Sequence, residues 1–225
     1  MQAVLQLRGS NTATVKEGMR ANGIAEDIVD LQKLIVNHFK YLERHLAAPS
    51  EDAQKLMVEV TGTNAIKTVV RSILTAEASL NNGGWRDPCR LALSPSRVLD
   101  EPREDVGERR GLQLCVRCTT GLPPPVQGEI RVARGTNVGL LAGAIAKRLR
   151  SHGAALVRGA GAVALKHQLR AVAIASGYLA ERGELENCDL VVLPRFEEVE
   201  VTDASKKLTE NLLTVYKLPH RDSQP

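Results

Sequence analysis

The chain has 225 residues, of which 43% are hydrophobic but only 3% are aromatic. This length accommodates one large or two small domains, and the core must be built from aliphatic side chains. So few aromatic residues argue against nucleic-acid modules that stack bases on Phe and Tyr. The net charge of +4 permits a polyanionic partner without requiring one.

The cysteines and the hydropathy pattern indicate the compartment. Four cysteines are too few for a disulfide scaffold of this length, and no secretory signal is recognisable. No run approaches the eighteen apolar residues of a membrane span. We therefore expect an intracellular protein, in the cytoplasm or in an organelle such as the mitochondrion, neither secreted nor inserted in a membrane.

Taken in chain order, the first half of the sequence predicts a βαβαββ series. Residues 3–7 are expected to form a strand, and Gly9 to Thr12 the loop after it. A helix then buries apolar side chains that recur every three or four residues: Ile28, Leu31, Ile35, Phe39, Leu42 and Leu46. A strand at 56–60, a helix at 64–80 and strands at 89–93 and 112–118 complete the series.

The second half predicts the same series after a proline-rich segment. Residues 119–128, TTGLPPPVQG, favour an extended spacer that reaches roughly 30 Å at about 3.1 Å per residue. A short strand at Ile130 and Val132 precedes a helix at 138–149, which Gly153 is expected to end. A strand at 155–157, a helix around Leu165 and Leu169, and strands at 188–193 and 212–218 follow.

The two halves also resemble each other residue by residue. When Lys67 is aligned with Lys166, the offset is 166 − 67 = 99 residues, and Val58 then falls on Val157. The register holds without a gap from the middle strand to the last one. We therefore predict two tandem domains of α/β (α+β) type at residues 1–118 and 129–220, each a small mixed sheet with two helices. A linker at 119–128 joins them, and a tail at 221–225 follows.

The second half resembles a known family. The stretch GTNVGLLAGAIAKRLRSHGAALVRGAGAVALKHQLRAVAIASGYLA, followed by CDLVVLP, is similar to the stage V sporulation protein S family. That fold resembles Alba, a βαβαββ domain that binds chromatin and RNA and usually dimerises. The resemblance covers about 90 residues, and the first half is linked to it only through the internal repeat. It implies two Alba-like domains, paired within one chain as an intramolecular pseudo-dimer.

The sequence departs from Alba where Alba contacts nucleic acid. The loops after the first strands, Gly9 to Thr12 and Gly135 to Val138, contain no lysine. Thr or Ala residues, not arginines, flank the glycine before the second helix. Only Lys67 and Lys166, one turn later, keep a basic group there. The resemblance therefore implies the fold more directly than it implies binding.

For three further patterns we prefer a structural interpretation to a functional one. Gly159 to Ala164 fits a dinucleotide-binding pattern, G-x-G-x-x-A, but tight packing between strand and helix explains it better. Cys115 and Cys118 form a lone C-x-x-C without the four ligands that zinc requires. The five histidines are scattered and adjoin no catalytic constellation. We expect no metal, no cofactor and no enzymatic activity.

The basic residues of the second half give the positive signal. Eight occur between residues 129 and 177, where Glu129 is the only acid. They either contact phosphates or form a solvated face that the acids of residues 181–200 balance. We predict RNA or DNA binding, with RNA favoured; the alternative is a scaffold subunit of a ribonucleoprotein, such as an organellar ribosome, with protein-binding domains. The candidate phosphate ligands are Arg134, Lys147, Arg148, Arg150, Arg158, Lys166 and Arg170, with Lys67 and Arg71 in the first half.

Overall fold

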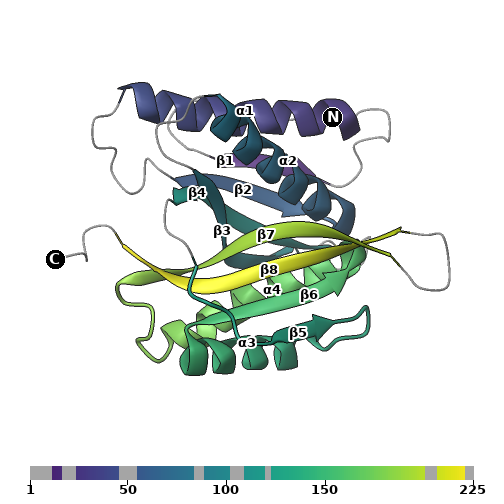
Figure 1. Cartoon of the computed structure of the whole chain (residues 1–225), viewed down its shortest axis with the longest axis vertical. Coiled ribbons are helices and arrows are strands. Elements are labelled where there is room, and N and C mark those ends of the chain that lie inside the picture. Colours follow the sequence, from purple (N-terminus) through teal and green to yellow (C-terminus); the bar gives the residue numbers. More distant parts are fainter. Residues whose placement is uncertain are drawn as a thin grey trace. The chain divides into compact units, whose positions relative to one another are not determined.

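A computed structural model describes residues 12–16, 24–45, 55–83, 89–101, 109–119, 123–200 and 207–220. The chain divides into two compact units, Met1–Gly121 and Leu122–Pro225 (Figure 1). The first unit contains β1 (Thr12–Lys16), α1 (Ile24–His45), β2 (Lys55–Thr61), α2 (Thr63–Asn82), β3 (Arg90–Glu101) and β4 (Arg109–Thr119). The second contains β5 (Glu129–Val132), α3 (Val138–His152), β6 (Ala154–Ala160), α4 (Gly161–Ala180), β7 (Cys188–Glu200) and β8 (Lys207–Pro219). The expected α+β class and the βαβαββ order are therefore found.

Each unit is a four-stranded mixed sheet with both helices on one face. The strand order is β1-β2-β4-β3 in the first unit and β5-β6-β8-β7 in the second. The first two strands of each unit are parallel, and the remaining neighbours are antiparallel. Both helical crossovers step in the same direction across the sheet. Because such crossovers are right-handed, both helices lie on the same face, and in the view of Figure 1 α4 lies behind β6 and β8.

The strand ladders of the two units share one register. Val58 of β2 lies opposite Leu114 of β4, and Val157 of β6 lies opposite Leu213 of β8, each 99 residues further along. Farther across the sheet, Leu91 faces Cys118, and Leu190 faces Lys217 at the same offset. A single-residue slip would move every side chain to the other face of its sheet. The two sheets therefore present equivalent positions to equivalent faces.

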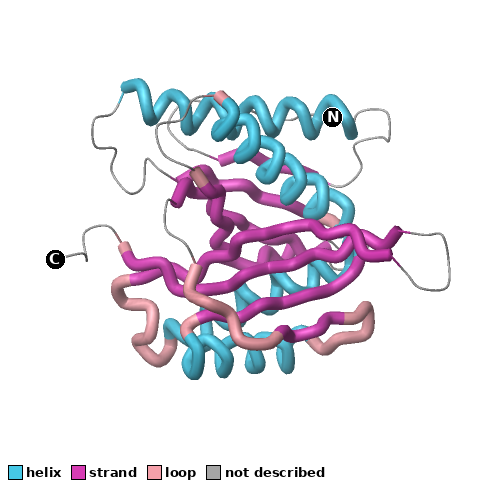
Figure 2. Tube along the Cα trace, viewed as in Figure 1, coloured by secondary structure: helices cyan, strands magenta, loops and turns pink. Residues whose placement is uncertain are grey.

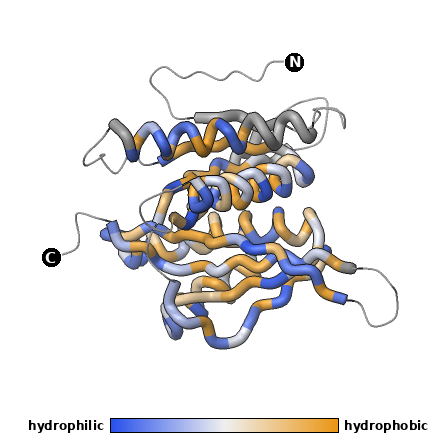
Figure 3. Tube along the Cα trace, turned by 45° about the horizontal axis from the view of Figure 1, so that its top comes forward, coloured by the Kyte–Doolittle hydropathy of each residue, from blue (hydrophilic) through white to orange (hydrophobic). Residues whose placement is uncertain are grey.

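The helix faces are apolar as their spacing predicted. In α1, Leu31, Ile35, Phe39 and Leu42 are all buried, and Figure 3 shows hydrophobic turns alternating with hydrophilic ones along this helix. The side chains of Ile28 and Leu46 lie outside the described residues. In the second unit, α3 and α4 bury aliphatic side chains over the sheet. The largest of these include Ile145, Leu165 and Leu169.

The first strand of the first unit differs from the expectation. The predicted strand at residues 3–7 lies outside the described residues. Thr12, expected in a loop, instead begins β1, whose Ala13 and Val15 pair with Val58 and Val60 of β2. The segment TATVK alternates threonine with small apolar residues. Threonine suits a strand because it is β-branched, which accounts for a strand that begins at Thr12.

The last two strands of each unit are longer than expected, because charged residues continue the ladder. In the first unit Asp100 pairs with Arg110 and Glu101 with Arg109, beyond a bulge after Pro95. In the second, Glu200 pairs with Lys207 at the outer end of the hairpin, which Figure 2 shows extending past its neighbours. The ladders therefore continue through charged residues that show no regular apolar alternation. Hydrophobic periodicity alone therefore ended these strands too early.

The proline-rich segment is attached to the second unit at its far end. Residues 123–127 have no regular secondary structure, and the boundary between the units falls within the predicted linker. The guanidinium of Arg148 on α3 donates a hydrogen bond to the carbonyl oxygen of Gln127. The following residue, Gly128, has φ +66°, which glycine adopts readily. The spacer therefore ends docked on α3.

Candidate nucleic-acid interface

The glycine-rich turn before α4 is explained by packing. A Cβ atom on Gly159 would lie 2.9 Å from the carbonyl oxygen of Val132 and 3.0 Å from the Cβ of Ala164. Gly161, with φ +81°, begins α4 in a conformation that side chains rarely tolerate. Both glycines therefore serve the passage from strand to helix, as the packing interpretation predicted.

A buried amide pair fixes the beginning of α4 on the sheet. Gln168 donates from Nε2 to the carbonyl oxygens of Val157 and Asn211, at 3.1 and 3.3 Å. Asn211 donates from Nδ2 to the carbonyl oxygen of Gly161 at 2.8 Å. Both side chains are almost fully buried. Buried amides with several partners hold an element in one position, so the outer face of α4 is presented rigidly.

That outer face carries a basic cluster, defined here as Lys166, His167 and Arg170. All three are half-buried. The preceding Leu165 and the intervening Gln168 and Leu169 are buried. Partial burial, followed by the charges of Arg170 and Lys166, holds the pKa of His167 below its usual value. Lys166 has no carboxylate partner in the part of the chain that the structure describes. Like charges are thus held together on one helix.

The first unit has a basic pair at the same two positions. Lys67 and Arg71 lie on α2, 99 residues before Lys166 and Arg170. Partial burial, then the charge of Arg71, lowers the pKa of Lys67. Thr68 occupies the position that His167 has in the second unit. Both units therefore place two cations four residues apart on the second helix.

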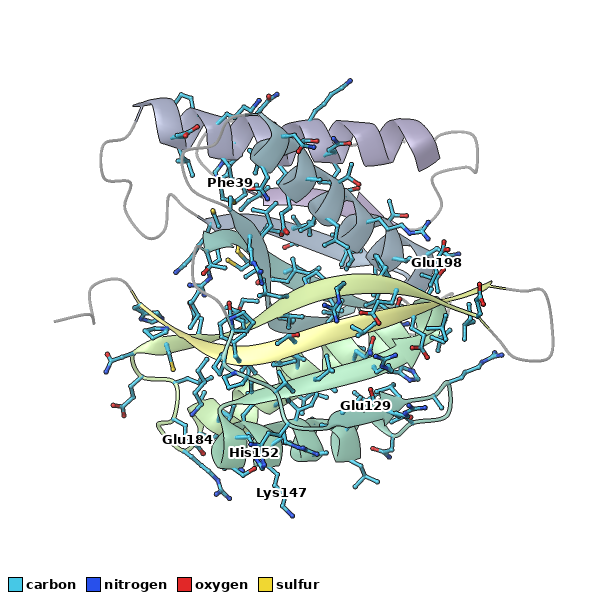
Figure 4. All side chains as sticks on the ribbon, in the orientation of Figure 1. Phe39, Glu129, Lys147, His152, Glu184 and Glu198 are labelled. Carbon is cyan, nitrogen blue, oxygen red and sulfur yellow. The ribbon has the colours of Figure 1, made fainter. Side chains whose placement is uncertain are left out.

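The candidates on α3 differ in their availability. Lys147 is exposed and projects from α3 away from the sheet (Figure 4). Arg148 is bound to Gln127, as described above. Arg150 donates to the carboxylate of Glu184 at 2.8 Å. Of the three, only Lys147 is without such a contact in the described chain.

The side chains of the turn between β5 and α3 have structural roles, which accounts for the absence of lysine there. Asn137 caps α3 by accepting a hydrogen bond at Oδ1 from the backbone N–H of Leu140, at 3.1 Å. Thr136 accepts one at Oγ1 from the N–H of Ala133, at 2.9 Å. These side chains are committed to the turn and the cap. Arg134 in the same turn is exposed.

Arg158 lies on the other face of the sheet, among three carboxylates. Its guanidinium is 2.6 Å from Glu210, 2.9 Å from Glu129 and 3.6 Å from Glu197. The hydrogen bond to Glu210 is the largest of the effects that raise the pKa of Arg158. Because three acids surround this cation, its charge is neutralised locally and attracts a phosphate weakly. Sequence reasoning missed the cluster because its acids come from three different strands.

The seven candidate residues of the second unit therefore do not form one surface. The structure places Lys166 and Arg170 on α4 and Lys67 and Arg71 on α2, while Lys147 and Arg134 are exposed on and before α3. Other groups of the second unit contact the remaining three residues, which are Arg148, Arg150 and Arg158. His167, which the sequence analysis passed over, lies within the cluster on α4. Its spacing from Lys166 and Arg170 was the available signal.

The cysteine motif is divided by the strand that carries it. Cys115 and Cys118 both lie on β4, and residues three apart on a strand point to opposite faces. The two thiols therefore cannot ligate one metal ion together. Among the described residues, no group of three or more His, Cys, Asp or Glu side chains is placed to hold a metal.

Comparison with known families follows the same division of the chain. Residues 128–216 match the stage V sporulation protein S family. The match spans β5 to β8 and supports the Alba-like fold of the second unit. That family is not a known enzyme family. In the described part of the chain, no helix is long and apolar enough to cross a membrane.

Proposed function

We propose that the chain binds nucleic acid without catalysis, and that phosphate groups contact the basic pairs on α2 and α4. The observation that carries the proposal is the recurrence of two cations, four residues apart, at the same position of both units. Like charges at this spacing destabilise a helix by about 0.2–0.5 kcal/mol. A bound polyanion would turn this unfavourable repulsion into a favourable interaction. RNA is the first ligand to test, with DNA of the same sequence beside it.

Contacts of this kind fix affinity without reading bases. Lysine and arginine that meet phosphates carry no sequence information, and their counterion release makes binding depend on salt. In each unit the basic pair of the second helix forms the centre of a proposed contact surface: Lys67 and Arg71 in the first unit, Lys166 and Arg170 in the second. Lys147 and Arg134 extend the surface of the second unit. We assign Arg148, Arg150 and Arg158 to the architecture of the second unit because each is engaged there.

The salt dependence of binding tests the proposal. We expect Lys166→Ala/Arg170→Ala to lower the slope of log affinity against log salt by about 1.4 on single strands and about 1.8 on duplex DNA, since each lost contact removes about 0.7 or about 0.9. Lys67→Ala/Arg71→Ala should act likewise. Arg131→Ala/Arg195→Ala is the matched control: it removes two exposed cations from the opposite face, where each pairs with a glutamate. A slope that neither test variant changes, or that the control changes equally, contradicts the proposal.

A scaffold role is the second candidate, and the β7–β8 hairpin favours it. Beyond the carboxylates that contact Arg158, Glu198 and Glu200 are exposed on β7. Carboxylates repel phosphates, so this hairpin suits a protein partner better than a nucleic acid. Nuclease treatment of the native complex distinguishes the roles, because a scaffold keeps its protein partners after the nucleic acid is digested. The pairing of the two units within one chain stays a prediction.

A further inference from the structure

We propose that His167 binds a phosphate group together with Lys166 and Arg170, and that the second unit takes up a proton as it does so. This inference rests on the proposed function and adds a ligand to its site. Unlike its neighbours, His167 changes charge within the physiological pH range. The bound state would therefore carry one more positive charge than the free state.

The geometry of the cluster supports a role for the imidazole. Lys166 and His167 lie four and three residues before Arg170, so each is a neighbour of Arg170 on the surface of α4 and Arg170 lies between them. The Nδ1 atom of His167 is buried from solvent and has no hydrogen-bond partner among the described residues. Nε2, the other ring nitrogen, is not among the buried atoms without a partner. Both nitrogens of a protonated imidazole are donors, so a phosphate oxygen accepts from Nε2.

Within the described residues, the elements packed against α4 contribute no carboxylate that acts on His167. On α3 the charged and titratable groups are basic: Lys147, Arg148, Arg150 and His152. On β5, β6 and β8, ion pairs join the charged groups Glu129, Arg131, Arg158 and Glu210 on the other face of the sheet. Lys217 of β8 pairs with Glu184. The charges that act on His167 are those of Arg170 and Lys166, and both disfavour its protonation.

A bound phosphate inverts this balance. In the free protein the lowered pKa keeps the imidazole neutral at neutral pH. A phosphate beside it stabilises the charged form and raises its pKa, so protonation and binding are linked. Affinity then increases as the pH falls through the pKa of the complex, and levels off below that of the free protein. Each unit of difference between the two is worth about tenfold in affinity.

The chain contains its own comparison. Thr68 stands at the position of His167, 99 residues earlier, between Lys67 and Arg71. The corresponding site of the first unit therefore binds phosphate without a proton at this position. The substitution His167→Thr gives the second unit the arrangement of the first. It leaves Lys166 and Arg170 unchanged, and with them most of the salt-dependent binding.

The experiment measures the affinity of the full-length chain for a short labelled single-stranded RNA between about pH 7.5 and 5.5, where histidine titrates. We expect wild-type affinity to rise about tenfold across this range if binding raises the pKa by one unit, and the affinity of His167→Thr to change little. Titration calorimetry in two buffers of different ionisation enthalpy should show proton uptake by the wild type that His167→Thr loses. His167→Gln gives the same comparison should the threonine variant unfold.

The outcomes separate this inference from the proposed function. Wild-type binding with a pH dependence that both His167 variants retain overturns the role of His167 but leaves the phosphate interface standing. Wild-type binding that does not vary with pH does the same. No binding by the wild type at any pH of the series overturns both proposals.

Discussion

The guanidinium of Arg158 lies 2.6 Å from the carboxylate of Glu210 and donates a hydrogen bond that joins β6 to β8. Glu129 adds a contact from β5 and Glu197 one from β7, so one cation links all four strands of the second sheet. Arg131 and Arg195 approach the outer oxygens of Glu129 and Glu197. The network belongs to the architecture of the unit, on the face away from the helices.

Removing the central cation should destabilise the second unit. We expect Arg158→Met to lower the free energy of unfolding by about 1–3 kcal/mol, because three carboxylates then adjoin without a counter-charge. Methionine retains an aliphatic stem, so the change reports mainly on the charge. Denaturation by urea measures it.

Arg131→Met is the control for that measurement. Its side chain is 79% exposed and, among the described residues, pairs with Glu129, so its removal should cost less than about 0.5 kcal/mol. Equal losses in the two variants would show that Arg158 does not hold the strands together. The nucleic-acid affinity of folded Arg158→Met should equal that of the wild type.

Glu184 should make stability depend on pH on the acid side. A hydrogen bond from Arg150, assisted by Lys217, lowers the pKa of this carboxyl in the folded state. A carboxyl of this kind stabilises the fold above its unfolded pKa, and the contribution is lost as the pH falls through the lower, folded value. Thermal unfolding should show Glu184→Gln melting below the wild type at neutral pH, with the difference shrinking in acid.

Glu186→Gln is the matched variant for this pH series, since Glu186 follows in the same turn and forms no ion pair within the described residues. Its melting temperature should track that of the wild type throughout. A constant gap between Glu184→Gln and the wild type, from neutral pH to acid, would mean that the ion pairs of Glu184 do not stabilise the fold.

Local periodicity predicted the core elements well because each buries a regular apolar face. The offset that aligns Val58 with Val157 predicted the matching registers of β2 and β6, since hydrophobic patterning sets register wherever one face is covered. These agreements support a duplication. The duplication stays a prediction, because the family match covers residues 128–216 of the second unit and does not extend to the first unit. Periodicity could not predict the charged ends of β3 and β7, because apolar residues do not alternate regularly there.

The candidate site was harder to predict because charge carries no information about partners. Arg158 and Lys166 look equivalent in the sequence, yet Arg158 meets acids from three strands whereas Lys166 meets none in the described chain. Such partners are distant in sequence and become neighbours only through the sheet. His167 has no acid or nucleophile near it in the sequence, so the sequence predicted no role for it.

Gly159 and Gly177 should respond in opposite ways to alanine. Gly159→Ala places a Cβ against the backbone oxygen of Val132, and we expect a loss of about 1–3 kcal/mol. Gly177 lies inside α4 with no atom within 4 Å of a new Cβ, so Gly177→Ala should gain about 0.5–1 kcal/mol. Urea denaturation measures both. Tolerance of alanine at Gly159 would remove the packing explanation and restore the question of a ligand there.

Lys147 and Arg148, although adjacent on α3, should affect different properties. Lys147 is exposed without a carboxylate partner in the described chain, so Lys147→Ala should reduce the salt slope of DNA binding by about 0.9 while leaving stability unchanged. Arg148→Ala removes the hydrogen bond to the carbonyl oxygen of Gln127. We expect the salt slope to stay at its wild-type value, and hydrogen exchange of the amides in residues 126–130 to accelerate as the segment detaches from α3. The two measurements together decide the assignment. If Arg148→Ala lowers the slope as much as Lys147→Ala does and leaves exchange unchanged, its guanidinium binds phosphate and the anchoring role is wrong. If neither variant changes the slope, the phosphate contacts are confined to the basic pairs of α2 and α4.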